Sequence, residues 1–215
     1  MSTFFVKSIL QPDEPEQSAE EALRHLLPKI TKNRGRVKIL NLGNKHNLLQ
    51  KLPSRLAAYR HRIANGERLR IVVLVDRDDD DCESLKGRLE SMARDAALPT
   101  KSSPDAKGCF LVLNRVVIEE LESWFIGDPT ALQKAFGSLP RINASTGIFR
   151  NPDKGGSWEA LHRFLKKHGI YKSGFPKIDA ARRIAPHMDV AANRSKSFQT
   201  FASGVEAILE TGSKP

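Results

Sequence analysis

The most informative stretch of the sequence is a run of aspartates that directly follows an apolar segment. Residues 69–75 (LRIVVLV) form a hydrophobic, β-branched run that is typical of a buried central strand. The run stops at Asp76, and Asp78 follows two residues later. Residues two apart in an extended segment face the same way, and α/β proteins usually place their sites at the carboxyl ends of strands. The sequence therefore predicts that Asp76 and Asp78 point together into a site.

Two carboxylates at one point need either a shared proton or a cation. Like charges about 4 Å apart repel by roughly 4 kcal/mol at an effective dielectric constant near 20. Hard oxygen ligands of this kind select Mg²⁺ or Mn²⁺ over zinc. The next three acids are better explained as the start of a helix, where the helix dipole favours negative charge; they are Asp79, Asp80 and Asp81.

The elements that must position these aspartates alternate between strand-like and helix-like patterns. Besides 69–75, we expect strands at residues 3–10, 36–42 and 109–113. We expect helices at residues 18–30, 46–64, 80–97, 116–125, 157–168, 178–184 and 197–209, with a kink or break at Pro53. This order favours an α/β domain over residues 1–126, with a mainly parallel four-stranded sheet flanked by helices, and a helical extension over 127–215 packed on it.

The charge of the chain indicates a polyanion as partner. Its 215 residues carry a formal net charge of +10, with a pI near 9.8. Lys and Arg exceed Asp and Glu by 8 in residues 1–70 and by 7 in 141–215, whereas the acids are in excess by 5 in 71–140. A basic chain with an acidic middle suits a groove that attracts nucleic acid and holds a divalent cation. Solvated faces that merely differ in charge would give the same sums.

Several classes of protein are disfavoured by what the sequence lacks. No stretch approaches the roughly 18 to 20 apolar residues of a membrane span, and the first residues lack the order of a signal peptide, so we expect a cytoplasmic protein without membrane contact. Cys82 and Cys109 form no CxxC pair and have no histidine at ligand spacing; we expect both to be buried. The sequence has no GxxxxGK[ST], so any ATP hydrolysis must come from another chain.

Basic residues that could contact phosphates occur at two turns. Lys45 lies at a Gly-Asn-Lys turn after the second expected strand, where it could reach a scissile phosphate. Arg194, Ser195 and Ser197 precede a helix and could cradle a phosphate with backbone N–H groups and a guanidinium. The other candidates for nucleic-acid contact are Lys177, Arg182, Arg183 and Lys196. An exposed charge or an ordinary helix cap would explain each of these residues equally well.

Further acids follow the first and fourth expected strands. Glu14 and Glu16 come after the first strand, which could lie beside the strand that ends at Asp76. After the fourth strand come Glu119, Glu120 and Glu122, one of which could complete a second metal site. Glu119 and Glu122 would share a helix face, with Glu120 about 100 degrees round from Glu119. Surface acids are the simpler explanation of this second group.

The glutamate-then-DxD order resembles the TOPRIM domain of topoisomerases, primases and overcoming-lysogenization-defect nucleases. More narrowly, the chain resembles the bacterial TOPRIM-like family DUF4276 over nearly its whole length. The segments that carry the resemblance are EQSAEEALRHLLP, GNKHNLLQKLPSRL, IVVLVDRDDDDCESLK, VVIEELESWFIGD and KIDAARRIAPHMDVAANRSKSF. The family usually has a compact turn such as EEPS after the first strand. The longer PDEPEQS here leaves Glu16 or Glu14 as its counterpart, and we prefer Glu16 for its distance from Ser18.

The resemblance implies a metal-dependent nuclease that cuts phosphodiester bonds of DNA or RNA with Mg²⁺ or Mn²⁺. It implies that Asp76 and Asp78 hold the metal and that Glu16 or Glu14 is a metal ligand or general acid/base. By similarity to the family's EELExW it favours Glu120 for a second metal. It also implies an ABC-type or AAA-type ATPase partner that controls the activity in antiphage defence.

Two other functions remain open on the sequence. The acidic cluster could bind metal without catalysis, in a nucleic-acid-binding module that regulates a partner ATPase. A phosphatase or glycosyltransferase could also use a DxD pair on a free nucleotide. Cleavage of a polymer that is lost in an Asp76→Ala variant separates the nuclease from both.

Overall fold

The computed structural model describes residues 3–7, 15–76, 80–117 and 121–211, with the backbone alone described at 3–7, 15–17 and 76. The chain divides into two compact units. The first consists of Met1–Pro12, Leu27–Ile118 and Ser203–Pro215, and the second of Asp13–Leu26 and Glu119–Ala202. A single cut after residue 126, as expected from the sequence, describes this division only coarsely, because helices α1 (Pro15–Thr31) and α8 (Lys196–Glu210) contribute residues to both units.

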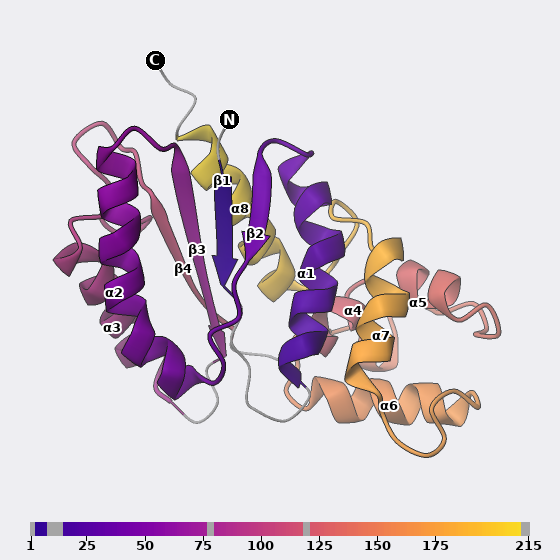
Figure 1. Ribbon diagram of the computed structural model, residues 1–215. Helices are drawn as coiled ribbons and strands as arrows, with labels where there is room; N and C mark the ends of the chain where they lie inside the picture. The colour runs from indigo at the N-terminus through magenta and orange to yellow at the C-terminus, as the bar shows by residue number, and fades with distance from the viewer. Residues whose placement is uncertain (1–2, 8–14, 77–79, 118–120, 212–215) are drawn as a thin grey trace. The chain divides into compact units, whose positions relative to one another are not determined.

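The first unit contains a four-stranded sheet in which every pair of neighbours is parallel. Its strands are β1 (Thr3–Lys7), β2 (Arg36–Ile39), β3 (Leu69–Asp76) and β4 (Val112–Val117). Their order is β2-β1-β3-β4, so the most apolar strand lies inside the sheet (Figure 1). Residues 71–75 of β3 are all buried, as a strand covered on both faces requires. The predicted α/β class with a parallel sheet is therefore confirmed.

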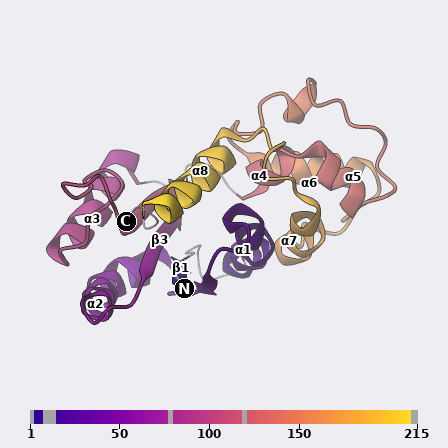
Figure 2. The same cartoon turned by 90° about the horizontal axis from the view of Figure 1, so that it is seen from above.

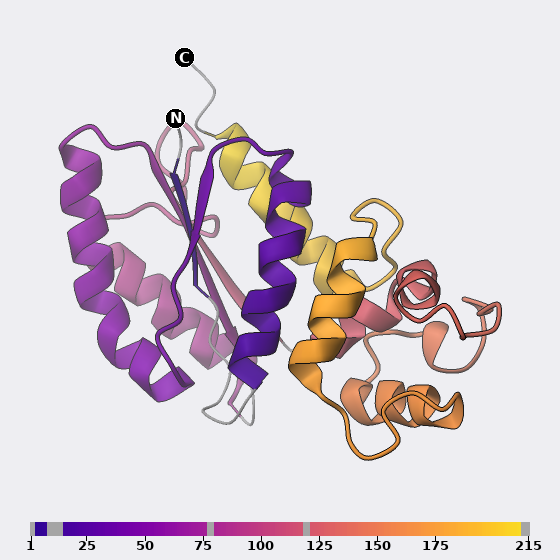
Figure 3. The same ribbon diagram turned by 45° about the vertical axis from the view of Figure 1, so that its right-hand side comes forward.

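One face of the sheet is covered by α2 (Lys45–Ala64) and α3 (Cys82–Asp95), as Figure 3 shows. Alternate residues of β3 point to this face and join the apolar side of both helices in one core. The members of this core from the helices include Leu48, Leu52, Leu56, Leu85 and Leu89, and those from β3 are Leu69, Ile71, Val73 and Val75. Burying this apolar stripe holds α2 and α3 on the sheet.

The other face of the sheet packs against the part of α8 that belongs to this unit (Figure 2). Gly204 of α8 lies so close to β4 that an added Cβ would be 3.0 Å from Cδ2 of Leu113. Near the end of the same helix, Nε of Arg70 donates to the carbonyl of Ile208 at 3.0 Å. The C-terminal helix is therefore part of the sheet-containing unit from Ser203 onward.

Several expectations about local structure are wrong. The helix expected at 116–125 begins only at Glu122, since residues 116 and 117 belong to β4. The fourth strand is Val112–Val117 and not 109–113, since its pairing with residues 71–76 of β3 outweighs the apolar run that begins at Cys109. Helix α2 continues through Pro53, so the chain is not split there. Pro53 is exposed, and the carbonyl that loses its partner can be solvated. Cys82 and Cys109 are partly exposed free thiols rather than buried residues.

The second unit is helical. Besides its part of α1 and α8, it contains α4 (Glu122–Ile126), α5 (Pro129–Ala135), α6 (Ser157–Lys167) and α7 (Lys177–Ile184), with 3-10 turns at Gly147–Phe149 and Ala185–His187. Trp124 is its largest core residue and stacks on Phe201 with ring centroids 5.1 Å apart. The helices expected at 157–168, 178–184 and 197–209 are confirmed within two residues.

Candidate active site at the carboxyl edge of the sheet

The parallel register brings the carboxyl ends of the strands to one edge of the first unit. Asp76, the last residue of β3, pairs with Val117, the last residue of β4. On the other side of β3, the end of β1 at Lys7 pairs with Val73. The chain therefore leaves all three strands at the same edge, which is where parallel α/β sheets usually bind ligands.

The aspartate run begins at this edge. Asp76 closes β3, whereas Asp78 and Asp79 lie outside the described residues. Asp81 is the N-cap of α3 and accepts a hydrogen bond from the backbone N–H of Ser84 at 2.8 Å. This hydrogen bond lowers the pKa of Asp81. The expected role at a helix start is confirmed for Asp81.

Lys45 reaches the same acidic loop from the next element. It is the first residue of α2, directly after the N-cap Asn44, whose side chain accepts from the backbone N–H of Asn47 at 2.9 Å. Its Nζ lies 2.7 Å from Oδ2 of Asp80, with the two side chains 20% and 46% exposed. A cation at the positive end of a helix is unfavourable, and Asp80 offsets that charge. Lys45 and the aspartate loop thus meet at the carboxyl edge.

The predicted glutamates are not placed by the structure. Glu14, Glu119 and Glu120 lie outside the described residues, as does the side chain of Glu16, whose backbone is in the first turn of α1. Within the described parts of the chain, no group of three His, Cys, Asp or Glu side chains could hold a metal ion. The metal set of Asp76, Asp78, Glu16 and Glu120 therefore stays a prediction. Its donors are all carboxylate oxygens, which are suitable ligands for Mg²⁺ or Mn²⁺.

Glu122, one of the three acids that the sequence offered for a second metal site, is a buried residue of the second unit and not a surface acid. Glu122 is only 2% exposed and lies 4.0 Å from Nζ of Lys177. The Lys177 ammonium also lies 5.3 Å from the centre of the Trp158 ring. The apolar neighbours of Glu122 in VVIEELESWFI were the available signal for its burial. Lys177 thus pairs with a buried acid and packs on an aromatic ring, and its assignment to nucleic-acid contact stays a prediction.

The expected phosphate cradle at the start of α8 is wrong. The carboxylate of Asp153 accepts from the Ser195 hydroxyl and the Lys196 backbone N–H, both at 2.6 Å, and from the Ser197 backbone N–H at 3.4 Å. Arg194 donates to the backbone carbonyls of Ala144 and Phe149. A carboxylate of the chain itself already occupies the position expected for a phosphate. The Lys196 side chain is exposed.

The two remaining basic candidates also have partners within the second unit. Nε of Arg182 lies 3.2 Å from Oε1 of Glu21. Arg183 donates to the carbonyl of Ala135 at 3.1 Å, and its guanidinium carbon lies 4.3 Å from the centre of the Phe136 ring. Both side chains are exposed, so these contacts leave part of each guanidinium in solvent. Their assignment to nucleic-acid contact stays a prediction.

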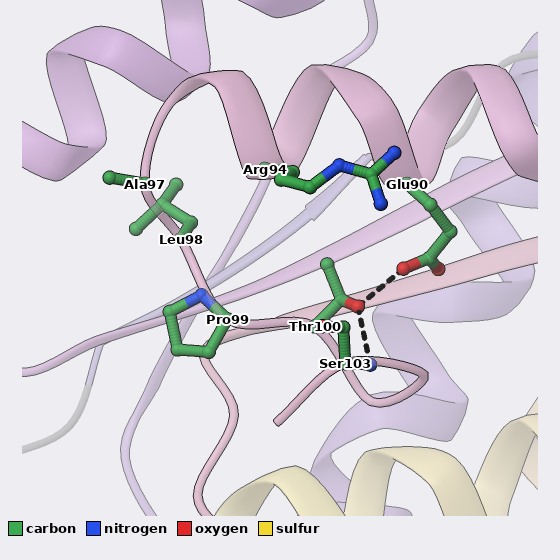
Figure 4. A pocket seen from close by; sticks show the side chains of 7 residues that line it. All are labelled: Glu90, Arg94, Ala97, Leu98, Pro99, Thr100 and Ser103. Carbon is green, nitrogen blue, oxygen red and sulfur yellow. Dashed lines mark hydrogen bonds between the residues drawn. The ribbon is translucent and has the colours of Figure 1, made fainter. Parts of the chain in front are cut away.

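A further polar cluster in the first unit joins α3 to β4. Glu90 accepts from Lys86 at 2.8 Å, from Asn114 at 3.1 Å and from the Thr100 hydroxyl. Burial alone would raise the pKa of Glu90, but these hydrogen bonds together hold it below its ordinary value. Glu90, Arg94 and Thr100 are among the residues that line a pocket of about 180 Å³. Figure 4 shows these side chains around it. Since its donors already occupy the Glu90 carboxylate, we interpret this cluster as structural.

One protein-family model matches the greater part of the chain. A family model described as a domain of unknown function, DUF4276, matches residues 16–206. The chain belongs to the DUF4276 family. In this DUF4276 protein the matched region contains three of the four strands, the aspartate loop and both α2 and α3. No curated protein and no solved structure matches the chain. Among the described helices, none is both long enough and apolar enough to cross a membrane.

Proposed function

We propose that this DUF4276 protein is a TOPRIM-like, metal-dependent nuclease that hydrolyses phosphodiester bonds of DNA or RNA. The observation that carries the proposal is the end of β3 at Asp76, between the ends of β1 and β4, with the Lys45 ammonium bound to the same acidic loop. Strand ends of parallel sheets are the usual place for such chemistry. The net charge of +10 supports a polyanionic substrate.

Each group of the chain has a distinct role in this proposal. Asp76 and Asp78 hold Mg²⁺ or Mn²⁺, and Glu16 or Glu14 is a further ligand or moves the proton of the attacking water. Glu120 would serve a second metal. A bound divalent ion supplies a water of lowered pKa and positive charge opposite the phosphate oxygens. Lys45, already at the edge, donates to a phosphate oxygen and so positions the scissile group.

The wider role follows from the resemblance to TOPRIM proteins. We propose that the nuclease is a cytoplasmic effector of antiphage defence whose activity an ABC-type or AAA-type ATPase controls. Such control would prevent damage to the nucleic acid of the cell. Copurification of an ATPase with the tagged protein, followed by a cleavage assay with and without ATP, tests this part separately.

Cleavage of labelled DNA and RNA by the purified protein in Mn²⁺ tests the nuclease proposal. We expect cleavage that EDTA stops and that Asp76→Asn lowers by at least about 10³-fold, because the metal loses a ligand. Asp95→Asn, which changes an exposed acid at the end of α3, is the matched control and should retain full activity. Circular dichroism shows whether each variant is folded.

Undiminished cleavage by folded Asp76→Asn would contradict the proposed site. Metal binding without cleavage of any polymer would favour the non-catalytic module that regulates an ATPase. Turnover of free nucleotides with polymers left intact would favour a phosphatase or glycosyltransferase.

A further inference from the structure

Arg115 of β4 is a half-buried guanidinium that has no counter-charge among the described side chains. It pairs with Leu74 in the sheet and lies on the edge strand. Its Nε is buried and has no hydrogen-bond partner. Among the described residues, no ion pair or side-chain hydrogen bond includes Arg115. Burial lowers the pKa of Arg115, and no carboxylate of the described side chains counteracts that shift. Such a group is unfavourable unless an anion binds to it.

Helix α8 is shaped to accommodate this guanidinium. A Cβ added at Gly204 would lie 2.8 Å from Nη2 and 3.1 Å from Nε of Arg115. Gly204 is in the interior of α8, where glycine is a poor helix former. Because Gly204 has no side chain, the guanidinium of Arg115 has room beside α8.

Lys101 is a second cation, close enough to Arg115 for their charges to interact, and it has no ion-pair partner among the described residues. The backbone N–H of Lys101 donates to the carbonyl of Val112 at 3.0 Å, which ties Lys101 to the start of β4. Its side chain is exposed. Burial lowers the pKa of Lys101, and the charges of Arg115 and Lys86 lower it further. Lys86 is neutralised by Glu90 at 2.8 Å, so the uncompensated charges here are those of Lys101 and Arg115.

We propose that Arg115 and Lys101 bind a phosphoryl group. A guanidinium and an ammonium whose charges interact match the charge and the acceptor oxygens of a phosphate. Arg115 lies two positions before Val117, which pairs with Asp76, and two strand residues span about 7 Å. If the proposed nuclease function is correct, the phosphoryl group belongs to the substrate backbone next to the cleavage site.

Thermal unfolding in phosphate and in chloride of equal ionic strength tests the binding site itself. We expect the Tm of the unmodified protein to rise by about 3 °C or more at a tenfold excess of phosphate over its Kd. The rise should disappear in Arg115→Gln, whose Tm without phosphate should be unchanged or higher because an uncompensated charge is removed. Arg88→Gln, an exposed arginine of α3, should respond like the unmodified protein.

Gly204→Ala provides a test that keeps every charge. Its added methyl group displaces the guanidinium, and the atoms in its way are the ends of the Arg115 and Leu113 side chains, which can move. We therefore expect Gly204→Ala to fold and to lose the response to phosphate. An equal response to phosphate in the unmodified protein and in both variants would overturn the site.

Binding of a labelled single-stranded oligonucleotide, measured by fluorescence anisotropy in EDTA, identifies the source of the phosphoryl group. We expect Arg115→Gln to bind about tenfold more weakly and the slope of log K against log salt to fall by about 0.7. Since EDTA prevents metal-dependent cleavage, this result does not depend on nuclease activity. A lost response to phosphate with unchanged oligonucleotide binding would overturn the assignment to nucleic acid and leave a site for free phosphate.

Discussion

Nζ of Lys45 lies 2.7 Å from Oδ2 of Asp80 and so ties the start of α2 to the loop that follows β3. Both side chains are partly exposed, and ion pairs of this kind contribute about 0–1 kcal/mol to stability. The ion pair therefore matters more for positioning the Lys45 ammonium than for the stability of the fold. It holds a cation at Asp80, two residues after Asp78 in the sequence.

Substituting each partner in turn distinguishes the role of the Lys45 ammonium from the role of the ion pair. We expect Lys45→Gln to lower the single-turnover rate of cleavage by about tenfold or more, because a charge-assisted hydrogen bond to phosphate is lost. Asp80→Asn should change the rate by less than about threefold, since Lys45 remains charged. Both variants should unfold within about 1 kcal/mol of the unmodified protein in urea. Equal losses of rate in the two variants would show that the ion pair itself is what cleavage requires.

The Glu90 cluster predicts a pH-dependent contribution to stability. The folded pKa of Glu90 is below its ordinary value of 4.5, so its ionised form stabilises the fold above that pH. The contribution is lost as the pH falls through the folded pKa. We expect Glu90→Gln to lower the free energy of unfolding by about 2 kcal/mol at neutral pH, and by less as the pH falls below 4.5.

Urea unfolding over a series of pH values measures this difference. Glu83→Gln, an exposed acid of the same helix, should change stability by less than about 0.5 kcal/mol and is the control. A deficit of Glu90→Gln that is constant with pH would mean that the carboxylate charge is not involved.

The cap that Asp153 forms on α8 predicts a stability defect without a catalytic one. Asp153→Ala removes the acceptor of the Ser195 hydroxyl and of the first backbone N–H groups of α8, so we expect a loss of about 1–2 kcal/mol. Lys196→Gln, which leaves the cap intact, should not change stability. Cleavage per folded molecule should stay the same in Asp153→Ala. Tighter oligonucleotide binding by folded Asp153→Ala would revive the phosphate cradle that the structure contradicts.

The features that the sequence predicted correctly are those with a local signal. The apolar run of β3 and its abrupt end at Asp76 are visible in a window of ten residues, and they are enough to predict a buried strand with an acidic carboxyl end. The start of α3 was similarly readable, since Asp81 precedes an apolar helical period.

What the sequence could not predict depends on partners far along the chain. Asp153 is 42 residues from Ser195, so nothing near the start of α8 indicated that its N–H groups were already occupied. The bounds of β4 depend on its register with β3, which the apolar residues at 109–113 do not reveal. Arg115 is an ordinary charged residue in the sequence. Its lack of a partner among the described residues becomes evident only when α8 is packed beside it.

Isothermal titration calorimetry with Mn²⁺ tests most directly whether Asp76 and Asp78 hold a metal. We predict saturable binding to the unmodified protein and a Kd at least about tenfold weaker in Asp76→Asn and in Asp78→Asn, with the Asp95→Asn control unchanged. Binding of equal strength in folded Asp76→Asn, or the absence of Mn²⁺ binding by the unmodified protein, would contradict the metal site and the hydrolysis proposed to depend on it.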